Sequence, residues 1–196
     1  MKTLVVSQRV DHFPDRKERR DALDERLGLW LSSSGFLPYP LPNALVATGM
    51  LQAWLERIQP SGVILSGGND IGNESLRDES EKALLEHALN HRLPVLGICR
   101  GMQMIGTWSG IKLKPVEGHL RTRHALSGTI TGTVNSFHRF SWADCPPQFE
   151  VLARSEDGEI EAIRHNDLPW EGWMWHPERE AEIDERDTLR LRTLFS

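Results

Sequence analysis

One of the two cysteines in the chain, Cys99, lies in a setting that suits a nucleophile. It is the centre of Gly97-Ile98-Cys99-Arg100-Gly101, between an apolar stretch typical of a buried strand and a stretch typical of a helix. Small residues two positions to either side allow a sharp turn that holds the side chain above the sheet. The first helical turn then stabilises a thiolate or an oxyanion through its free N–H groups and its dipole. The alternative is a small buried side chain of the core.

A cysteine nucleophile needs a base, and His176 is the best placed of the eight histidines. It lies in the segment WMWHPE, residues 173–178, which we predict to be the end of a strand. Residues i and i+2 of an extended chain share a face, so His176 and Glu178 are predicted to point the same way. The carboxylate would then orient the imidazole and stabilise its protonated form. The alternative is a strand end with a solvated glutamate.

A third segment, Ser66-Gly67-Gly68-Asn69-Asp70, follows another apolar stretch. Glycines let the backbone approach a ligand closely and direct N–H groups toward it. Ligands of parallel sheets bind at the carboxyl ends of the strands, so this loop and Cys99 are predicted to open on the same edge. The alternative is an ordinary turn.

These segments depend on strands and helices that bring them together. The first 110 residues alternate between strands predicted at 4–7, 36–39, 62–65 and 94–98 and helices predicted at 23–31, 51–58, 77–90 and 101–108. This order is typical of a parallel sheet with helices on both faces. The wholly apolar segment 94–98 predicts a central strand, whereas Pro38 indicates an edge strand.

The pattern changes after Gly110. Short segments separated by Gly, Pro and Asp predict antiparallel or mixed strands at 111–113, 129–134, 151–155 and 160–163, a late strand at 172–175 and a closing helix at 188–195. No Gly/Ser-rich linker divides the chain, so we expect a single domain over residues 1–196.

Composition excludes several classes of function. The net charge is −5, which gives no basic excess for nucleic acid or an anionic membrane. The only apolar run near the N-terminus, Leu4 to Val6, is too short for a signal peptide core, and no run approaches transmembrane length. We therefore expect a cytoplasmic protein without nucleic-acid or membrane partners, and the oligomeric state is not predicted.

The remaining histidines and the second cysteine suggest no further chemistry. His87 and His91 are spaced for one helix face, but no third ligand with metal spacing accompanies them, and we predict surface positions. We predict no metal and no cofactor. Two cysteines do not form the dense disulfide framework of a small secreted domain, and Cys145 has no predicted role.

Taken together, these motifs resemble the class I glutamine amidotransferase superfamily, and more closely its γ-glutamyl hydrolase-like branch. The resemblance runs in order from Gly62 to Glu178. It comprises the GG loop, Arg77-Asp78-x-x-Glu81, the segment 94–103 (PVLGICRGMQ), Gly118-His119, Val134-Asn135-Ser136-Phe137-His138 and Trp175-His176-Pro177-Glu178. It implies an α/β fold: a flavodoxin-like three-layer sandwich with a mainly parallel central sheet and a small antiparallel excursion in the C-terminal half.

The resemblance also implies roles for the residues. Cys99 attacks the γ-carbonyl of a glutamyl group and forms a γ-glutamyl thioester, while His176 transfers the proton and Glu178 orients it. The remaining implied positions are the oxyanion-hole N–H groups of Gly68 and Arg100, the glutamate-binding Gln103, the glutamate-binding backbone of Asn135, Ser136 and Phe137, and the loop-shaping His138. Arginine at position 100, where ammonia-producing members commonly have leucine, favours the hydrolase branch.

A narrower resemblance is to the γ-glutamyl-CDP-amidate hydrolases of bacterial capsule phosphoramidate synthesis, which release glutamate and cytidine diphosphoramidate. The segments that carry it are Ser7-Gln8-Arg9, 64–70, 134–140 and 174–179. Arg9, Arg139 and Arg179 would suit the diphosphate of the leaving group, since guanidinium groups pair well with phosphate oxygens. The alternative for each arginine is a solvated surface charge, and a γ-glutamyl polyamine or a folate-like substrate remains open.

Two other functions remain open from sequence. The same three catalytic residues would serve a glutaminase subunit that passes ammonia to a partner synthetase. Such a subunit would need that partner, because the chain has no room for a synthetase domain of its own. The non-enzymatic alternative is a binding module in which Cys99 acts as a thiol sensor.

Overall fold

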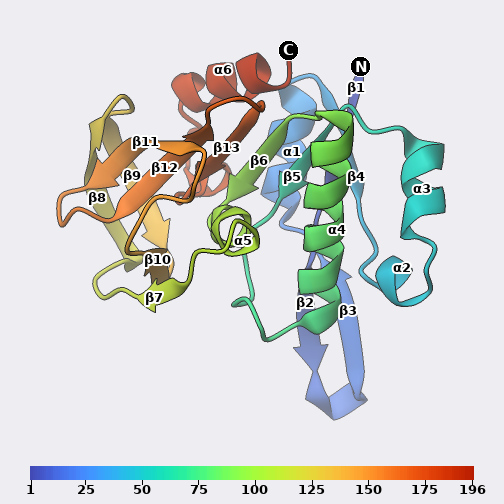
Figure 1. Ribbon diagram of the computed structural model, residues 1–196. Coiled ribbons are helices and arrows are strands. Elements are labelled where there is room, and N and C mark those ends of the chain that lie inside the picture. Colours follow the sequence, from blue (N-terminus) through green and yellow to red (C-terminus); the bar gives the residue numbers. More distant parts are fainter.

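The computed structural model describes residues 1–196, and its centre is a nine-stranded sheet with the order β4-β1-β5-β6-β13-β12-β11-β8-β9 (Figure 1). The strands, in chain order, are β1 (Lys2–Val6), β4 (Phe36–Pro40), β5 (Gly62–Leu65), β6 (Val95–Ile98), β8 (Leu120–Gly128), β9 (Gly132–Phe137), β11 (Phe149–Ser155), β12 (Ile160–His165) and β13 (Trp170–Trp173). From β4 to β13 all neighbours are parallel. Every residue of β5 and β6 is buried, as expected for central parallel strands.

Helices cover both faces of the parallel half. They are α1 (Glu25–Ser33), α2 (Ala44–Ala47), α3 (Leu51–Ile58), α4 (Ser75–His91), α5 (Arg100–Trp108) and α6 (Glu185–Leu194). Leu4 and Val6 of β1 enter a core with α1 and α6, whereas Val5 enters a second core with α3, α4 and α5. Alternate residues of one strand thus serve two cores, and the three-layer α/β sandwich predicted from the sequence is confirmed.

The C-terminal half extends the same sheet in antiparallel fashion through β12, β11, β8 and β9. A separate pair, β7 (Leu113–Pro115) and β10 (Phe140–Trp142), lies beside it. The strand predicted at 111–113 begins two residues before β7, and the one predicted at 129–134 includes the turn before β9 as well as the first three residues of β9. The long strand β8 was missed because its burial pattern is almost wholly exposed, so no apolar alternation marks it.

A hairpin of β2 (Arg9–Phe13) and β3 (Glu18–Ala22) also escaped prediction, and it projects from the end of the sheet (Figure 1). Its tip is the short 3-10 helix η1 (Pro14–Arg16), after which Lys17 adopts a left-handed conformation. The hairpin is mostly charged and half exposed, so its sequence resembles a loop. It places Arg9 directly after β1, beside the candidate site.

Two further features bear on the earlier expectations. Cys99 and Cys145 are both free, so the structure contains no disulfide. A bilayer crossing would need a longer and more apolar helix than any found here.

Candidate active site

Cys99 lies at a sharp turn between β6 and α5. Its backbone angles, φ 52° and ψ −105°, are strained for a residue with a side chain. The turn depends on glycines, because a Cβ at Gly97 would come within 2.6 Å of the Gly101 carbonyl, and one at Gly101 within 2.0 Å of the Leu65 carbonyl oxygen. The backbone N–H of Cys99 donates to Trp173 O at 2.7 Å. The predicted nucleophile geometry is therefore present in the backbone.

His176 and Glu178 meet beside Cys99. The imidazole Nδ1 lies 2.7 Å from Glu178 Oε1, and both side chains are almost wholly buried. The i, i+2 argument was right about the contact but wrong about the backbone: β13 ends at Trp173, and Glu178 belongs to the 3-10 helix η2 (Pro177–Arg179). The ring also packs on Gly67, where a Cβ would come within 2.5 Å of His176 Cε1.

The electrostatics of His176 favour its charged form. Burial lowers the pKa of His176, but the neighbouring Cys99 sulfur and the Glu178 carboxylate outweigh that effect and raise the pKa to about 9. A charged imidazole next to a sulfur stabilises a thiolate there. The three side chains can thus support acyl transfer by a cysteine nucleophile.

Asn135 fixes the backbone of His176 from both sides. Its Oδ1 accepts a hydrogen bond from His176 N at 2.9 Å, and its Nδ2 donates to His176 O and to Glu180 Oε1, each at 2.8 Å. The resemblance implied a role only for the backbone of Asn135. The side chain has a positioning role that motif spacing does not reveal.

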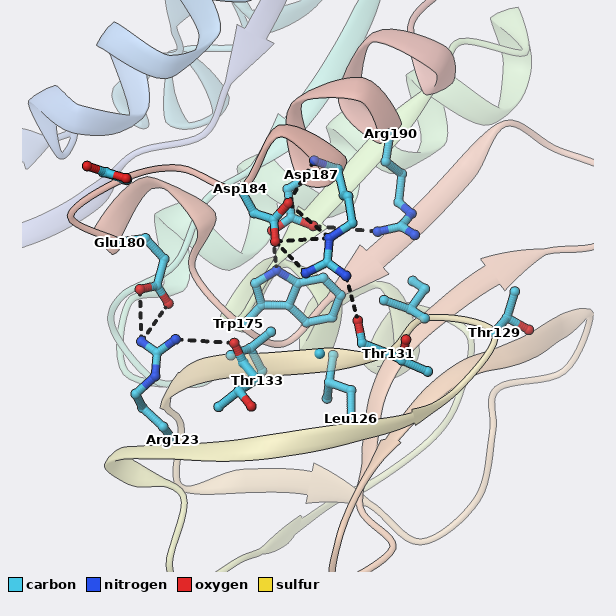
Figure 2. Close-up of a pocket in the computed structure, with 15 residues that line it drawn as sticks. Arg123, Leu126, Thr129, Thr131, Thr133, Trp175, Glu180, Asp184, Asp187 and Arg190 are labelled. Carbon is cyan, nitrogen blue, oxygen red and sulfur yellow. Dashed lines mark hydrogen bonds and ion pairs between the residues drawn. The ribbon is translucent and has the colours of Figure 1, made fainter.

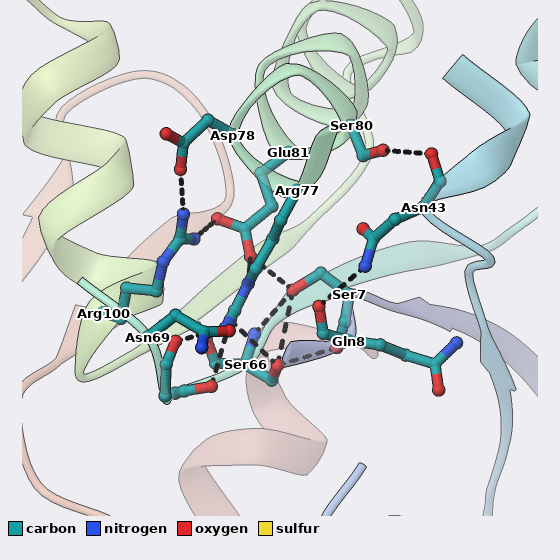
Figure 3. A network of polar contacts seen from close by, with 12 residues as sticks. Ser7, Gln8, Asn43, Ser66, Asn69, Arg77, Asp78, Ser80, Glu81 and Arg100 are labelled. Atoms are coloured by element: carbon teal, nitrogen blue, oxygen red, sulfur yellow. Dashed lines mark hydrogen bonds and ion pairs between the residues drawn. The ribbon is translucent and has the colours of Figure 1, made fainter. Parts of the chain in front are cut away.

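The glycine loop is tied to α4 by a buried guanidinium (Figure 3). Arg77 donates to the carbonyl oxygens of Ser66, Gly67 and Gly68, and its Nε donates to Glu81 Oε1 at 3.0 Å. With φ 84°, Gly68 adopts a conformation that favours glycine. Since the carbonyl groups face Arg77, the loop is held in one backbone conformation beside Cys99.

The side chain of Arg100 is shielded from solvent. It is 2% exposed and forms ion pairs with Asp78 and Glu81 (Figure 3). Burial raises the pKa of Glu81, but Arg100 and Arg77 outweigh it and hold the pKa of this carboxyl below its usual value. Arg100 is the first residue of α5, where a backbone N–H has no acceptor within the helix. Its backbone remains suited to an oxyanion hole.

A hollow of about 320 Å³ opens over Cys99. The predicted residues that line it are Gly68, Cys99, Arg100, Gln103, Phe137, His138 and Arg139. Gln103 donates to Phe140 O at 2.9 Å, and the Phe137 ring meets the His176 ring edge-on, with centroids 5.7 Å apart. Ser136 is wholly buried and donates to His119 O at 2.7 Å, so its side chain supports this wall from behind.

The three arginines predicted for the leaving group line two different pockets, one that contains Cys99 and one that contains His176. Arg139 lines the hollow over Cys99, whereas Arg9 and Arg179 line a small crevice beside His176. The Arg9 side chain is 44% exposed and pairs with Asp11 at 3.0 Å. The Arg179 guanidinium lies 4.8 Å from the centre of the Phe137 ring. All three are within the region of the site, but they do not form a single cluster.

A second hollow of about 270 Å³ lies between the β8–β9 hairpin and α6 (Figure 2), and Cys99 is not among the residues that line it. Its arginines are already paired, Arg123 with Glu180 at 2.8 Å, Arg186 with Asp184 at 2.6 Å and Arg190 with Asp187 at 3.5 Å. Paired cations offer little to an anionic ligand, and no nucleophile lines this hollow. It is therefore not a rival active site.

Comparison with known proteins agrees with the geometry. The family model described as glutamine amidotransferase class-I matches residues 42–194, well over half of the chain. The chain belongs to this family. Members of the class I glutamine amidotransferase family are C–N hydrolases, and the resemblance drawn from the six motifs is confirmed.

Two relatives of similar identity carry the names of two different activities. The γ-glutamyl-CDP-amidate hydrolase of Campylobacter jejuni subsp. jejuni serotype O:2 is 35% identical over 134 residues, 65% of this chain and 67% of that protein. A glutamine-hydrolysing GMP synthase subunit of Methanothrix thermoacetophila is 35% identical over 137 residues, 63% of this chain and 70% of that protein.

Among solved structures, the similarity is to the fold alone. A Thermoplasma acidophilum protein provisionally assigned as a GMP synthase subunit superposes with a TM-score of 0.76 at 19% identity. The alignment covers 100% of this chain and 92% of that one. The mainly parallel α/β sheet is thus the fold of this amidotransferase family.

Proposed function

We propose that this chain is a γ-glutamyl amidohydrolase: it cleaves a γ-glutamyl amide bond through a γ-glutamyl thioester on Cys99 and releases L-glutamate. The observation that supports this most directly is the convergence of Cys99, His176 and Glu178 at the carboxyl edge of the sheet, with the glycine loop beside them. In this proposal the whole chain, residues 1–196, acts as one amidotransferase-like domain.

In the first half of the proposed reaction, the sulfur of Cys99 attacks the γ-carbonyl carbon, and a C–S bond forms as the carbonyl oxygen becomes an oxyanion. When the oxyanion collapses, the C–N bond breaks and the departing nitrogen takes the proton of His176. In the second half, His176 removes a proton from water, which attacks the thioester. Glutamate and the free thiol of Cys99 result. Glu178 holds the imidazole throughout.

The oxyanion would bind to the backbone N–H groups of Gly68 and Arg100. Both residues line the hollow that contains Cys99, and both are held by buried ion-pair networks on α4. Donors that are already oriented stabilise the developing charge without reorganisation, and losing one typically costs about 3 kcal/mol.

For the glutamyl half of the substrate we propose the wall formed by Gln103 and by the backbone of residues 135–137. For the leaving group we propose cytidine diphosphoramidate, so that the substrate is γ-glutamyl-CDP-amidate. The support is the 35% identity to a hydrolase of that name, together with Arg139 beside Cys99 and Arg9 and Arg179 beside His176. Guanidinium groups on two sides of the nucleophile suit an extended diphosphate.

A second candidate is a glutaminase subunit that supplies ammonia to a partner synthetase. The similarity to a glutamine-hydrolysing GMP synthase subunit, also 35% identical, favours it. This candidate uses the same three residues but requires glutamine as substrate and a partner protein for full activity.

One assay distinguishes between the two candidate functions. Purified protein is tested alone for glutamate release from γ-glutamyl-CDP-amidate, glutamine and a γ-glutamyl polyamine. We expect the fastest turnover on the nucleotide substrate, without any partner. Turnover of glutamine alone would favour the glutaminase subunit, whereas a preference for the polyamine would remove the nucleotide from the proposal.

The matched control is the other free cysteine. Cys145 is half-buried and donates to Phe149 O at 3.3 Å, outside the candidate site. Cys99→Ala should abolish glutamate release, and Cys145→Ala should retain it. Activity that survives the loss of Cys99 would overturn the proposal.

A further inference from the structure

Three histidines from separate parts of the chain surround one buried carboxylate that does not line the hollow over Cys99. They are His119, just before β8, His124 on β8 and His138, just after β9, and the carboxylate is Glu161 on β12. We call these four residues the histidine cluster. The side chains of Glu161 and His138 are 0% exposed, His119 is 4% exposed and His124 is 10% exposed.

Glu161 is aimed into the cluster by an irregularity of the sheet. Ile160 pairs with Arg154 of β11 and Ala162 pairs with Ala153, so Glu161 is left over between two register positions. Such bulges redirect a side chain. A wholly buried carboxylate is costly unless its charge is matched, so the environment must supply a cation here.

Neither oxygen of Glu161 has a hydrogen-bond partner, and neither has Nε2 of His124. Yet ligand atoms crowd around them: His119 Nδ1, His124 Nε2 and His138 Nε2 each lie 3.3 Å from a Glu161 oxygen. His119 Nδ1 and His138 Nε2 are 3.1 Å apart. The nitrogen atoms converge on the carboxylate without the angles that hydrogen bonds require.

Two rings each hold an acceptor at the nitrogen that faces away from Glu161. His138 Nδ1 lies 3.0 Å from Phe140 O, and His119 Nε2 lies 2.9 Å from Asp157 Oδ2. Since a carbonyl and a carboxylate only accept, these nitrogens carry the protons. In the neutral form of the rings, which is the form that binds a metal, lone pairs on His138 Nε2 and His119 Nδ1 would face Glu161. Such outer hydrogen bonds to a carbonyl or a carboxylate are usual for histidines that bind metals.

Three of the ligand atoms have the spacing of a tetrahedral ion: His119 Nδ1 and His138 Nε2 each lie 3.3 Å from Glu161 Oε1 and 3.1 Å from each other. His124 Nε2 lies 3.3 Å from the other carboxylate oxygen, Oε2. Zinc–ligand bonds of about 2.0–2.1 Å place neighbouring ligand atoms about 3.3 Å apart. The ligand atoms of His119, His124 and Glu161 also lie within 4.8 Å of one another. We propose that the histidine cluster binds one divalent transition-metal ion of the zinc type, with three imidazole nitrogens and one Glu161 oxygen as ligands.

Four protein ligands would leave no open position, so the ion would be structural rather than catalytic. It would join β8, β12 and the segment after β9. That segment begins at His138, which lines the hollow over Cys99 together with Phe137, the last residue of β9. The ion would therefore stabilise the wall opposite the glycine loop. This inference does not depend on which γ-glutamyl substrate is cleaved.

The test uses the full chain without a histidine tag, purified in the absence of chelators. Elemental analysis by mass spectrometry should find about one equivalent of metal per chain. After chelation, Zn²⁺ should raise the Tm of the apoprotein by about 5–10 °C at a hundredfold excess over Kd. Co²⁺ should give the intense d–d absorption of a tetrahedral site. A metal-free chain whose Tm and spectrum ignore both ions would overturn the proposal, because protons would then neutralise Glu161.

Variants locate the site. His124→Gln should weaken Zn²⁺ binding by more than about 100-fold, and Asp157→Asn, an exposed residue that orients His119, by about 10-fold. The control is His87→Gln, whose ring stacks on His91 on α4 and should leave Zn²⁺ affinity unchanged. Asp157→Asn keeps every proposed ligand and replaces only an exposed side chain, so it remains informative where His124→Gln does not fold. Unchanged affinity in both variants would contradict the assignment.

Discussion

The side chain of Asn135 holds the peptide groups on both sides of the His176 Cα, because it accepts from His176 N and donates to His176 O. Asn135→Ala should leave these buried groups unpaired and let the imidazole drift from Cys99. We expect kcat/KM to fall about 100-fold, since small misplacements of a catalytic group cost that much, and stability to fall by about 1–3 kcal/mol. Steady-state kinetics and urea unfolding measure the two effects. A stability loss without a change in kcat/KM would contradict the positioning role.

The raised pKa of His176 predicts where activity declines at alkaline pH. Its folded pKa of about 9 exceeds the ordinary 6.5, so its contribution to stability is complete below pH 6.5 and is lost as pH rises through about 9. Because the departing nitrogen needs this proton, kcat/KM should decline above about pH 9. Glu178→Gln removes a cause of the raised pKa and should move that decline to lower pH. The measurement is kcat/KM as a function of pH for the unsubstituted protein and for Glu178→Gln. An alkaline decline at the same pH in both would argue against the His176–Glu178 pair.

The glycines of the Cys99 turn should not be replaceable. A Cβ at Gly101 meets Leu65 backbone, so Gly101→Ala should destabilise the fold by more than about 3 kcal/mol. Gly28 lies within α1, and a Cβ there meets nothing within 4 Å. Gly28→Ala should therefore stabilise the chain by about 1 kcal/mol. In thermal unfolding, the Tm should fall for Gly101→Ala and rise for Gly28→Ala. A Gly101→Ala protein with an unchanged Tm would contradict the close packing around the turn.

Arg100 should matter for folding more than for substrate affinity. Arg100→Leu would leave Asp78 and Glu81 short of a buried cation, which typically costs about 3–5 kcal/mol. Denaturant unfolding measures that loss. A variant of normal stability with a raised KM would show instead that the guanidinium contacts substrate.

Arg139 provides a test of the leaving group. If it pairs with a diphosphate, Arg139→Ala should raise KM for γ-glutamyl-CDP-amidate about 10-fold or more and leave KM for glutamine unchanged. The matched control is Arg164, an exposed residue of β12 that pairs with Glu150 of β11. An equal rise for both substrates would assign Arg139 to the glutamyl half or to the shape of the wall.

The sequence predicted the parallel half of the fold well because its strands are short apolar runs and its helices show clear periodicity. Cys99 was found because glycines at fixed spacing constrain a turn. The β2–β3 hairpin and β8 were missed because charged, exposed strands lack the alternation that marks a buried face. Their pairing is decided by tertiary contacts rather than by local pattern.

The supporting residues were harder to predict than the reacting ones. Nothing near Arg77 indicates that its guanidinium reaches three carbonyls of a loop about ten residues earlier. The same holds for the histidine cluster, whose members are separated by up to 42 positions, from His119 to Glu161. Only the bulge in β12 and the fold of β8 and β9 bring these side chains together.

The attachment of the glycine loop to Arg77 also limits how this protein can be controlled. Turning the peptide between Gly67 and Gly68 would pull at least one carbonyl away from a guanidinium that is 0% exposed to solvent. A loop held in this way is poorly suited to switch between a resting and an active form. We therefore expect the rate of glutamate release to follow the supply of substrate, with no lag and no need for an allosteric signal to assemble the oxyanion hole.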